Sequence, residues 1–225
     1  MNTLITYKIF SDKEDKLKKA ARISCNFWNR YIVPERSVVI RLGTFTSKGL
    51  VIARAYKPYT SASGVYGAVE FNTKYLDKFD DRDIAGTVIH EICHTLGFGW
   101  DKWLRMFSRY SGEFFGSAIK EIPSLQYMTV ETDHGPGTQY SHWDEEKFDL
   151  ELMTGFKDPM EYVLPVTIKV MGLLGHTVIE ELPTKTDLGL LIDRADGIVF
   201  SRAEDAKSLD RDYWVETDVM EELYD

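Results

Sequence analysis

A run of five residues near the middle of the chain, HEICH from His90 to His94, restricts the fold more than any other stretch. Residues four apart on an α-helix project from the same face, so both imidazoles can reach one metal ion. Glu91 is rotated by about 100° from His90 and therefore lies near the ion without binding it. Zinc hydrolases use this arrangement to hold the ion and to accept a proton from water. The run predicts a zinc site on a helix.

The residues on both sides of this run favour a buried helix. Asp80 or Asp81 suits the N-cap, and Asp83 places a negative charge in the first turn. We expect the helix to end at residues 97–99, GFG, because glycine permits a left-handed exit. Cys93 points in a different direction from the two histidines, so we expect it in the core rather than on the metal. Further apolar residues complete the core-facing side: Ile84, Val88, Ile89, Ile92 and Leu96.

The rest of the N-terminal half alternates between strand-like and helix-like patterns. A helix is expected at residues 12–31, with Ser11 and Glu14 at capping-box spacing and Cys25 as a small buried apolar residue. Runs rich in β-branched or alternating apolar residues predict four strands, at residues 3–10, 37–45, 50–56 and 64–72. Together these elements predict an α/β (α+β) fold with a mixed, twisted sheet.

We divide the chain into three parts. Residues 1–99 are expected to form an N-terminal α/β subdomain that contains the zinc helix. Residues 100–178 are expected to form a mainly helical C-terminal subdomain, with an aromatic-rich stretch at 100–132 and a helix at 167–174. The aromatic residues of that stretch are expected to build a local core, although some could instead line an apolar cleft. Residues 179–225 form an acidic extension.

The charge of the chain is concentrated at one end. Residues 176–225 contain 14 acidic and 5 basic residues, a net charge of −9 that equals the net charge of the whole chain. We expect Val199, Phe200 and residues 213–215 to pack against the body, with the acidic residues serving solubility. Alternatively, the extension folds over the zinc site and holds it inactive.

The composition excludes several classes of protein. A net charge of −9 argues against a general nucleic-acid binder, and no apolar run approaches the ~20 residues of a membrane span. The first residues lack the features of a signal peptide, which predicts cytoplasmic synthesis and leaves release by lysis or packaging in a particle open. Two cysteines cannot form a disulfide framework and suit a reducing compartment.

A catalytic zinc ion needs a third protein ligand beyond the two helix histidines. The histidines that remain are His134, His142 and His176. A carboxylate such as Glu113 or Glu121 is a further alternative, and it would give a thermolysin-type site. The spacing of these residues alone does not choose among them.

Two longer motifs carry a resemblance to a known family. The run HEICHTLGFG, from His90 to Gly99, is similar to the motif of the metzincin zinc peptidases. Most metzincins place the third histidine three residues after the glycine, where this chain has Trp100. The leishmanolysin-like branch has an insertion there instead. Downstream, the segments GPGT at 135–138, SHW at 141–143 and ELMTG at 151–155 resemble the leishmanolysin pattern.

The resemblance implies a metzincin-like fold and a ligand set. It assigns His142 as the third zinc ligand beside His90 and His94, and Met153 as the methionine of the turn beneath the zinc. It also implies an edge strand that pairs with extended substrate, for which residues 64–72 are the candidate. An ordinary interior strand is the alternative for that segment.

The motif and the resemblance together predict a zinc-dependent endopeptidase that acts on protein or peptide substrates. Glu91 is then the general base and the proton shuttle. A second hypothesis is a non-enzymatic structural or binding protein that retains the metzincin fold and a zinc site. A third is a zinc hydrolase that acts on a non-peptide substrate. The presence of Glu91 favours the enzymes, because a structural zinc site needs no base.

Overall fold

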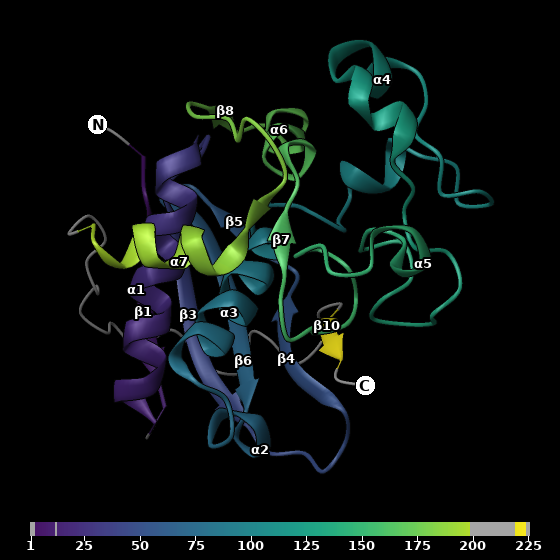
Figure 1. Cartoon of the computed structure of the whole chain (residues 1–225). Coiled ribbons are helices and arrows are strands. Elements are labelled where there is room, and N and C mark those ends of the chain that lie inside the picture. The colour runs from purple at the N-terminus through teal and green to yellow at the C-terminus, as the bar shows by residue number, and fades with distance from the viewer. Residues whose placement is uncertain (1–2, 12, 199–218, 224–225) are drawn as a thin grey trace.

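The computed structural model describes residues 3–11, 13–198 and 219–223. Its centre is a mixed, twisted sheet in the order β1-β3-β6-β4-β10, with β5 paired to β6 (Figure 1). The strands are β1 (Ile5–Phe10), β3 (Val38–Phe45), β4 (Val51–Tyr56), β5 (Tyr59–Ser61), β6 (Gly64–Asn72) and β10 (Val219–Leu223). Strands β1, β3 and β6 are parallel, whereas β4 runs antiparallel to β6 and β10 antiparallel to β4. The predicted α+β class with a mixed, twisted sheet is confirmed.

Helices α1 (Glu14–Tyr31) and α3 (Asp81–Thr95) pack side by side against the sheet, and α7 (Leu188–Asp196) lies on them (Figure 1). Two hydrogen bonds join α1 to α3 in the core. The Trp28 indole donates to the carbonyl of Ile89 at 3.0 Å, and the Ser24 hydroxyl donates to that of Ala85 at 3.1 Å. Trp28 is fully buried, so its N–H would lose its partner if the two helices moved apart.

The second half of the chain consists of short elements around an aromatic cluster. Trp103 contacts Phe98 with ring centroids 3.8 Å apart and Trp143 with centroids 5.1 Å apart. Phe107 and Phe114 pack on the same indole, which confirms the local core expected for part of this stretch. The short elements of this half are η1 (Trp103–Arg105), α4 (Ser117–Glu121), η2 (Pro123–Tyr127), α5 (Glu145–Phe148), β7 (Tyr162–Val163), α6 (Pro165–Leu174), β8 (Thr177–Val178) and β9 (Thr186–Asp187). The first half also contains β2 (Ile32–Val33) and α2 (Thr73–Leu76).

Two expectations for the N-terminal half are wrong. The edge strand expected at residues 64–72 is the interior strand β6, which pairs with β3 on one side and with β4 and β5 on the other. The capping box expected at Ser11 does not form. The Ser11 hydroxyl accepts a hydrogen bond from the amide of Lys13 at 3.0 Å, and Lys13 becomes the N-cap without a side-chain bond.

Two further expectations concern the acidic extension and the membrane. Residues 199, 200 and 213–215, which we expected to pack against the body, lie outside the described residues. Among the helices of the part that the structure describes, none combines the length and the apolar character of a membrane span. The strand β10 is the described part of the acidic extension beyond residue 198.

Candidate metal centre

Helix α3 carries the HEICH run and is fixed at both ends. The Asp80 carboxylate accepts hydrogen bonds from the amides of Arg82 and Asp83 at 2.8 and 2.9 Å, and the Asp83 carboxylate reaches back to the amide of Asp80. The helix ends before Gly97, whose φ of +112° requires glycine. All residues from 84 to 95 are buried. The expected caps and the expected burial are therefore confirmed.

Three histidine side chains meet at the buried face of this helix. The Nε2 atoms of His90 and His94 are 3.0 Å apart, and His142 brings its own Nε2 to 3.1 and 3.2 Å from them. All three side chains are fully buried. The three residues form a group that could hold a metal ion.

Each imidazole is also held by its other nitrogen, Nδ1, which bonds to a backbone carbonyl oxygen. The pairs are His90 with Leu152 at 2.7 Å, His94 with Phe98 at 3.0 Å and His142 with Thr138 at 3.0 Å. A carbonyl only accepts, so each Nδ1 carries the hydrogen and each Nε2 of a neutral ring presents a lone pair. Three lone pairs that face one another repel unless a cation lies between them. The donor set therefore fits a metal ion that prefers nitrogen ligands.

Burial keeps these imidazoles uncharged. It lowers the pKa of His90 to about 4 and that of His142 to about 3, and it lowers the pKa of His94 well below the usual value. The neighbouring histidines add to the effect on His94, because two charged rings at this distance would repel. Neutral imidazole is the form that binds a metal, so the site needs no deprotonation near pH 7.

These shifts predict that the metal-free protein loses stability as the pH falls from 6.5 toward 5. The three folded pKa values lie below the ~6.5 of exposed histidine, so the unfolded chain binds more protons in this window. Each histidine contributes up to about 1.4 kcal/mol per pH unit. Burial raises the pKa of Glu151 to about 7, and the bond to Glu131 raises that of His134, so both groups have the opposite sign in this window. Burial also lowers the pKa of His176, so four imidazoles outweigh these two groups. Urea unfolding at pH 6.5 and pH 5 in the presence of a chelator measures the change.

Matched variants identify the source of this pH dependence. His142→Ala removes a buried imidazole and should weaken the pH dependence of stability. His134→Ala removes a partly exposed imidazole whose pKa is raised by its bond to Glu131, so it should not weaken that pH dependence. Equal pH dependence in the parent and in His142→Ala would contradict the assignment.

Two further residues of the HEICH run, Glu91 and Cys93, carry groups that can ionise but lie outside the nitrogen group. Glu91 follows His90 and has a fully buried side chain. Cys93 is also buried, and burial raises the pKa of its thiol well above the usual value. A protonated thiol is a poor metal ligand, which agrees with its expected place in the core.

The other ligand candidates are not brought to this group. His134 bonds to the Glu131 carboxylate at 2.8 Å and, with Asp133, forms a separate cluster nearer the surface. Glu113 is exposed and accepts from the Ser111 hydroxyl at 3.2 Å, and Glu121 is exposed at the end of α4. Of the residues weighed as third ligand from the sequence, the structure places His142 beside the helix pair.

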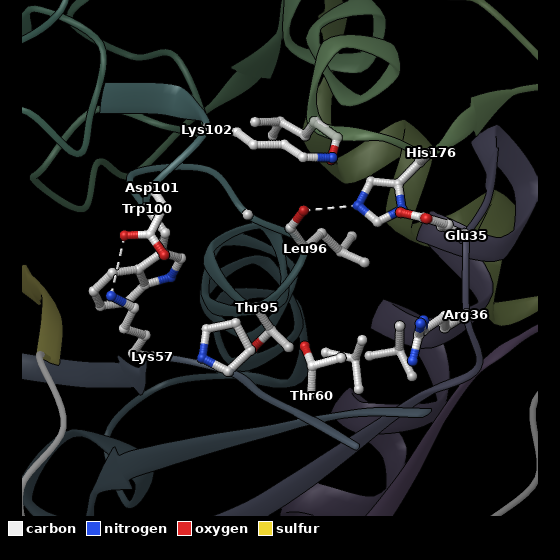
Figure 2. A pocket seen from close by; sticks show the side chains of 15 residues that line it. Glu35, Arg36, Lys57, Thr60, Thr95, Leu96, Trp100, Asp101, Lys102 and His176 are labelled. Carbon is white, nitrogen blue, oxygen red and sulfur yellow. Dashed lines mark hydrogen bonds and ion pairs between the residues drawn. The ribbon is translucent and has the colours of Figure 1, made fainter. Parts of the chain in front are cut away.

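His176, the remaining histidine, lies beyond the end of α3. Its Nε2 donates to the carbonyl of Leu96 at 2.7 Å. Figure 2 shows it on the wall of a cavity of about 280 Å³, which Thr95 and Trp100 also line. None of the three grouped histidines is among the residues that line this cavity. The cavity is therefore separate from the nitrogen group.

A buried carboxyl that the sequence analysis named only as part of the ELMTG motif, without a role, organises the segment after His142. Glu151 accepts hydrogen bonds from the amides of Met153 and Leu164 at 2.6 and 3.1 Å and from the Thr167 hydroxyl at 2.7 Å. The same hydroxyl accepts from the Trp143 indole at 3.0 Å. Glu151 thus fixes the turn from which the Leu152 carbonyl reaches His90. The signal was a lone glutamate within the apolar run LELM, which spacing alone does not mark as buried.

Met153 lies within this turn and is fully buried. Its carbonyl accepts a hydrogen bond from the amide of Trp143 at 2.8 Å, and Trp143 directly follows His142. The turn therefore contacts the segments of two of the grouped histidines, His90 through Leu152 and His142 through Trp143.

Comparison of the chain with family models gives no match, and a search of curated proteins gives none either.

Proposed function

We propose that this protein is a zinc-dependent endopeptidase similar to the leishmanolysin-like metzincins. The observation that carries the proposal is the meeting of three buried Nε2 atoms, two from the HEICH helix and one from His142. Glu91 is buried on the same helix and directly follows His90 in the chain. A purely structural site would not need a buried carboxylate at that position.

The donor set supports zinc as the metal. Two nitrogen ligands about 2.0–2.1 Å from one zinc ion, at a tetrahedral angle, are about 3.3 Å apart. The three Nε2–Nε2 distances of 3.0–3.2 Å are close to this value. Calcium and magnesium prefer oxygen ligands, so a group of three imidazoles disfavours them. Three protein ligands also leave a fourth position open, as catalytic zinc sites require.

The surrounding fold supports the metzincin resemblance. A mixed sheet lies against the helix that carries the first two histidines, and the third comes from the second half of the chain after an insertion. Met153 lies in a buried turn bonded to the segments of His90 and His142. This is the relation that the resemblance implies for the methionine beneath the metal.

The chain's own residues account for the proton transfers. When bound, zinc supplies a Lewis acid that lowers the pKa of water and polarises the scissile carbonyl. Glu91 accepts the proton of the attacking water and delivers it to the leaving amine. The three Nδ1–carbonyl bonds keep His90, His94 and His142 in one orientation, and burial keeps bulk water from the donors.

Metal analysis combined with proteolysis tests the proposal. We expect about one zinc per chain, hydrolysis of an unfolded protein substrate, loss of hydrolysis on chelation and recovery when zinc is added back. A zinc-loaded, folded protein that hydrolyses no peptide would contradict the proposal and favour the structural or binding protein. Hydrolysis that survives complete removal of the metal would contradict it as well.

A further inference from the structure

The outer edge of β4 is covered by a short strand from far along the sequence. Strand β10 runs antiparallel to β4, with Met220 opposite Ala55 and Glu221 opposite Arg54. Figure 1 shows it in yellow beside β4, at the end of the sheet. Since β6 occupies the inner edge of β4, β10 occupies the edge at which an added extended peptide would pair.

The other side of β10 faces the loop that carries His142. Met220 is buried, and its Cε lies 2.9 Å from the place a Cβ would take at Gly99; the Cβ of Ser141 is equally close to that place. Ser141 in turn bonds through its hydroxyl to Nδ1 of His142 at 2.9 Å. Met220 and Ser141 therefore both lie against Gly99, and Ser141 bonds to a member of the nitrogen group.

Glu221, the next residue of β10, also lies against the loop that carries His142. A Cβ at Gly137 would lie 3.4 Å from the Cβ of Glu221, and the next residue, Thr138, holds His142 by its carbonyl. Strand β10 thus lies between β4 and the loop 137–141. The glycines at 99 and 137, both with positive φ, leave room for the side chains of this strand.

We propose that the outer edge of β4, together with Gly99, Gly137 and Ser141, is a peptide-binding groove, and that β10 is its internal ligand. The inference rests on the proposed function, since it names what occupies the groove beside the metal site. Its ligand is an extended peptide with a flexible apolar side chain, as in Met220, at the Gly99–Ser141 position and an acidic residue after it. While β10 is in place, it excludes a substrate from this edge.

The contacts of β10 suit a ligand that can be exchanged. The strand is five residues long, and its register shifts between Glu222 and Leu223, so regular pairing ends there. Because strand and groove belong to one chain, the strand competes with free peptide at a high effective concentration. Free peptide should therefore bind well only after a contact of β10, such as that of Met220, has been removed.

A binding experiment in the Glu91→Gln background, where the peptide is not consumed, tests the groove. The probe is a fluorescently labelled peptide of residues 217–225. Met220→Asp places a charge at an apolar contact and should lower the Kd of the labelled peptide at least ~10-fold relative to the Met220 chain. The matched control is Met160→Asp, since Met160 is 72% exposed and should leave the Kd unchanged. No gain in binding for folded Met220→Asp, or an equal gain in both variants, would overturn the proposal.

A reversible cross-link covers the case in which Met220→Asp does not fold. Ala55 and Met220 are directly opposite, so Ala55→Cys with Met220→Cys should form a disulfide under mild oxidation. The oxidised chain should bind no labelled peptide, and the reduced chain should bind it. Failure to form the cross-link would overturn the proposal, and so would equal binding of the labelled peptide by the oxidised and the reduced chain.

The activity measurement separates this inference from the proposed function. With Glu91 intact, Met220→Asp should hydrolyse an unfolded substrate several-fold faster than the parent. If no variant hydrolyses peptides but binding follows Met220, the proposed function fails and the groove stands. If the parent hydrolyses peptides but Met220→Asp changes neither the Kd of the labelled peptide nor the rate of hydrolysis, the proposed groove is wrong and the proposed function stands.

Discussion

Replacing Glu91 with glutamine is expected to lower the rate of peptide hydrolysis at least ~100-fold, the lower end of the cost of losing a general base. Glutamine has nearly the size of glutamate, so it should fit the same buried position, but it cannot accept the proton of the attacking water. The metal content should stay at the parental value, because Glu91 is not part of the group of three Nε2 atoms. Rate and zinc content are measured on the same preparation.

Glu113→Gln is the matched control for this experiment. It makes the same chemical change at an exposed glutamate that is not in the nitrogen group, so the rate should stay at the parental value. If Glu91→Gln kept the parental rate, the proposed role of Glu91 would be wrong whatever its metal content. If it lost zinc together with activity, the residue would be shown to support the metal rather than the proton transfer.

The local parts of the fold could be predicted because they depend on neighbours in the sequence. Helix α3 begins at its expected aspartate cap and ends before Gly97, since caps and glycine act within one turn. The interior position of β6 could not be predicted, because alternation marks two faces of a strand but not its lateral neighbours. The position of β10 could not be predicted for the same reason, and its acidic residues were expected to serve solubility.

The candidate site also has parts that could be predicted from the sequence and parts that could not. His90 and His94 could be paired from spacing, because one helical turn separates them. His142 is 48 residues beyond His94 in the chain and was singled out only by the resemblance of the segment around it. The partners of the three Nδ1 atoms are backbone carbonyls, which no side-chain pattern reveals. The role of Glu151 was missed because its donors, two amides and a hydroxyl, come together only in the folded turn.

Replacing His142 with alanine is expected to weaken zinc binding more than ~100-fold, since loss of a group that merely supports a ligand already costs 10–100-fold. The reason is geometric: its Nε2 lies 3.1 and 3.2 Å from those of His90 and His94, so its loss leaves two nitrogen donors. A titration with a competing chromogenic chelator measures the affinity. His134→Ala should leave the stoichiometry near one zinc per chain, because His134 bonds to Glu131 in a separate cluster.

The comparison of the two alanine variants also decides between the two metal-capable clusters that contain a histidine. His142→Ala removes a buried ring and leaves the Thr138 carbonyl without that donor, so some loss of stability is expected with or without metal. The chelated parent is therefore the reference for folding, and only the zinc-dependent gain in stability reports the site. If His134→Ala lost zinc and His142→Ala kept it, the ion would belong to Glu131, Asp133 and His134, whose mixed oxygen and nitrogen donors lie nearer the surface. No metal would then be bound by the group that includes the neighbour of Glu91, and both the ligand assignment and the proposed peptidase mechanism would be wrong.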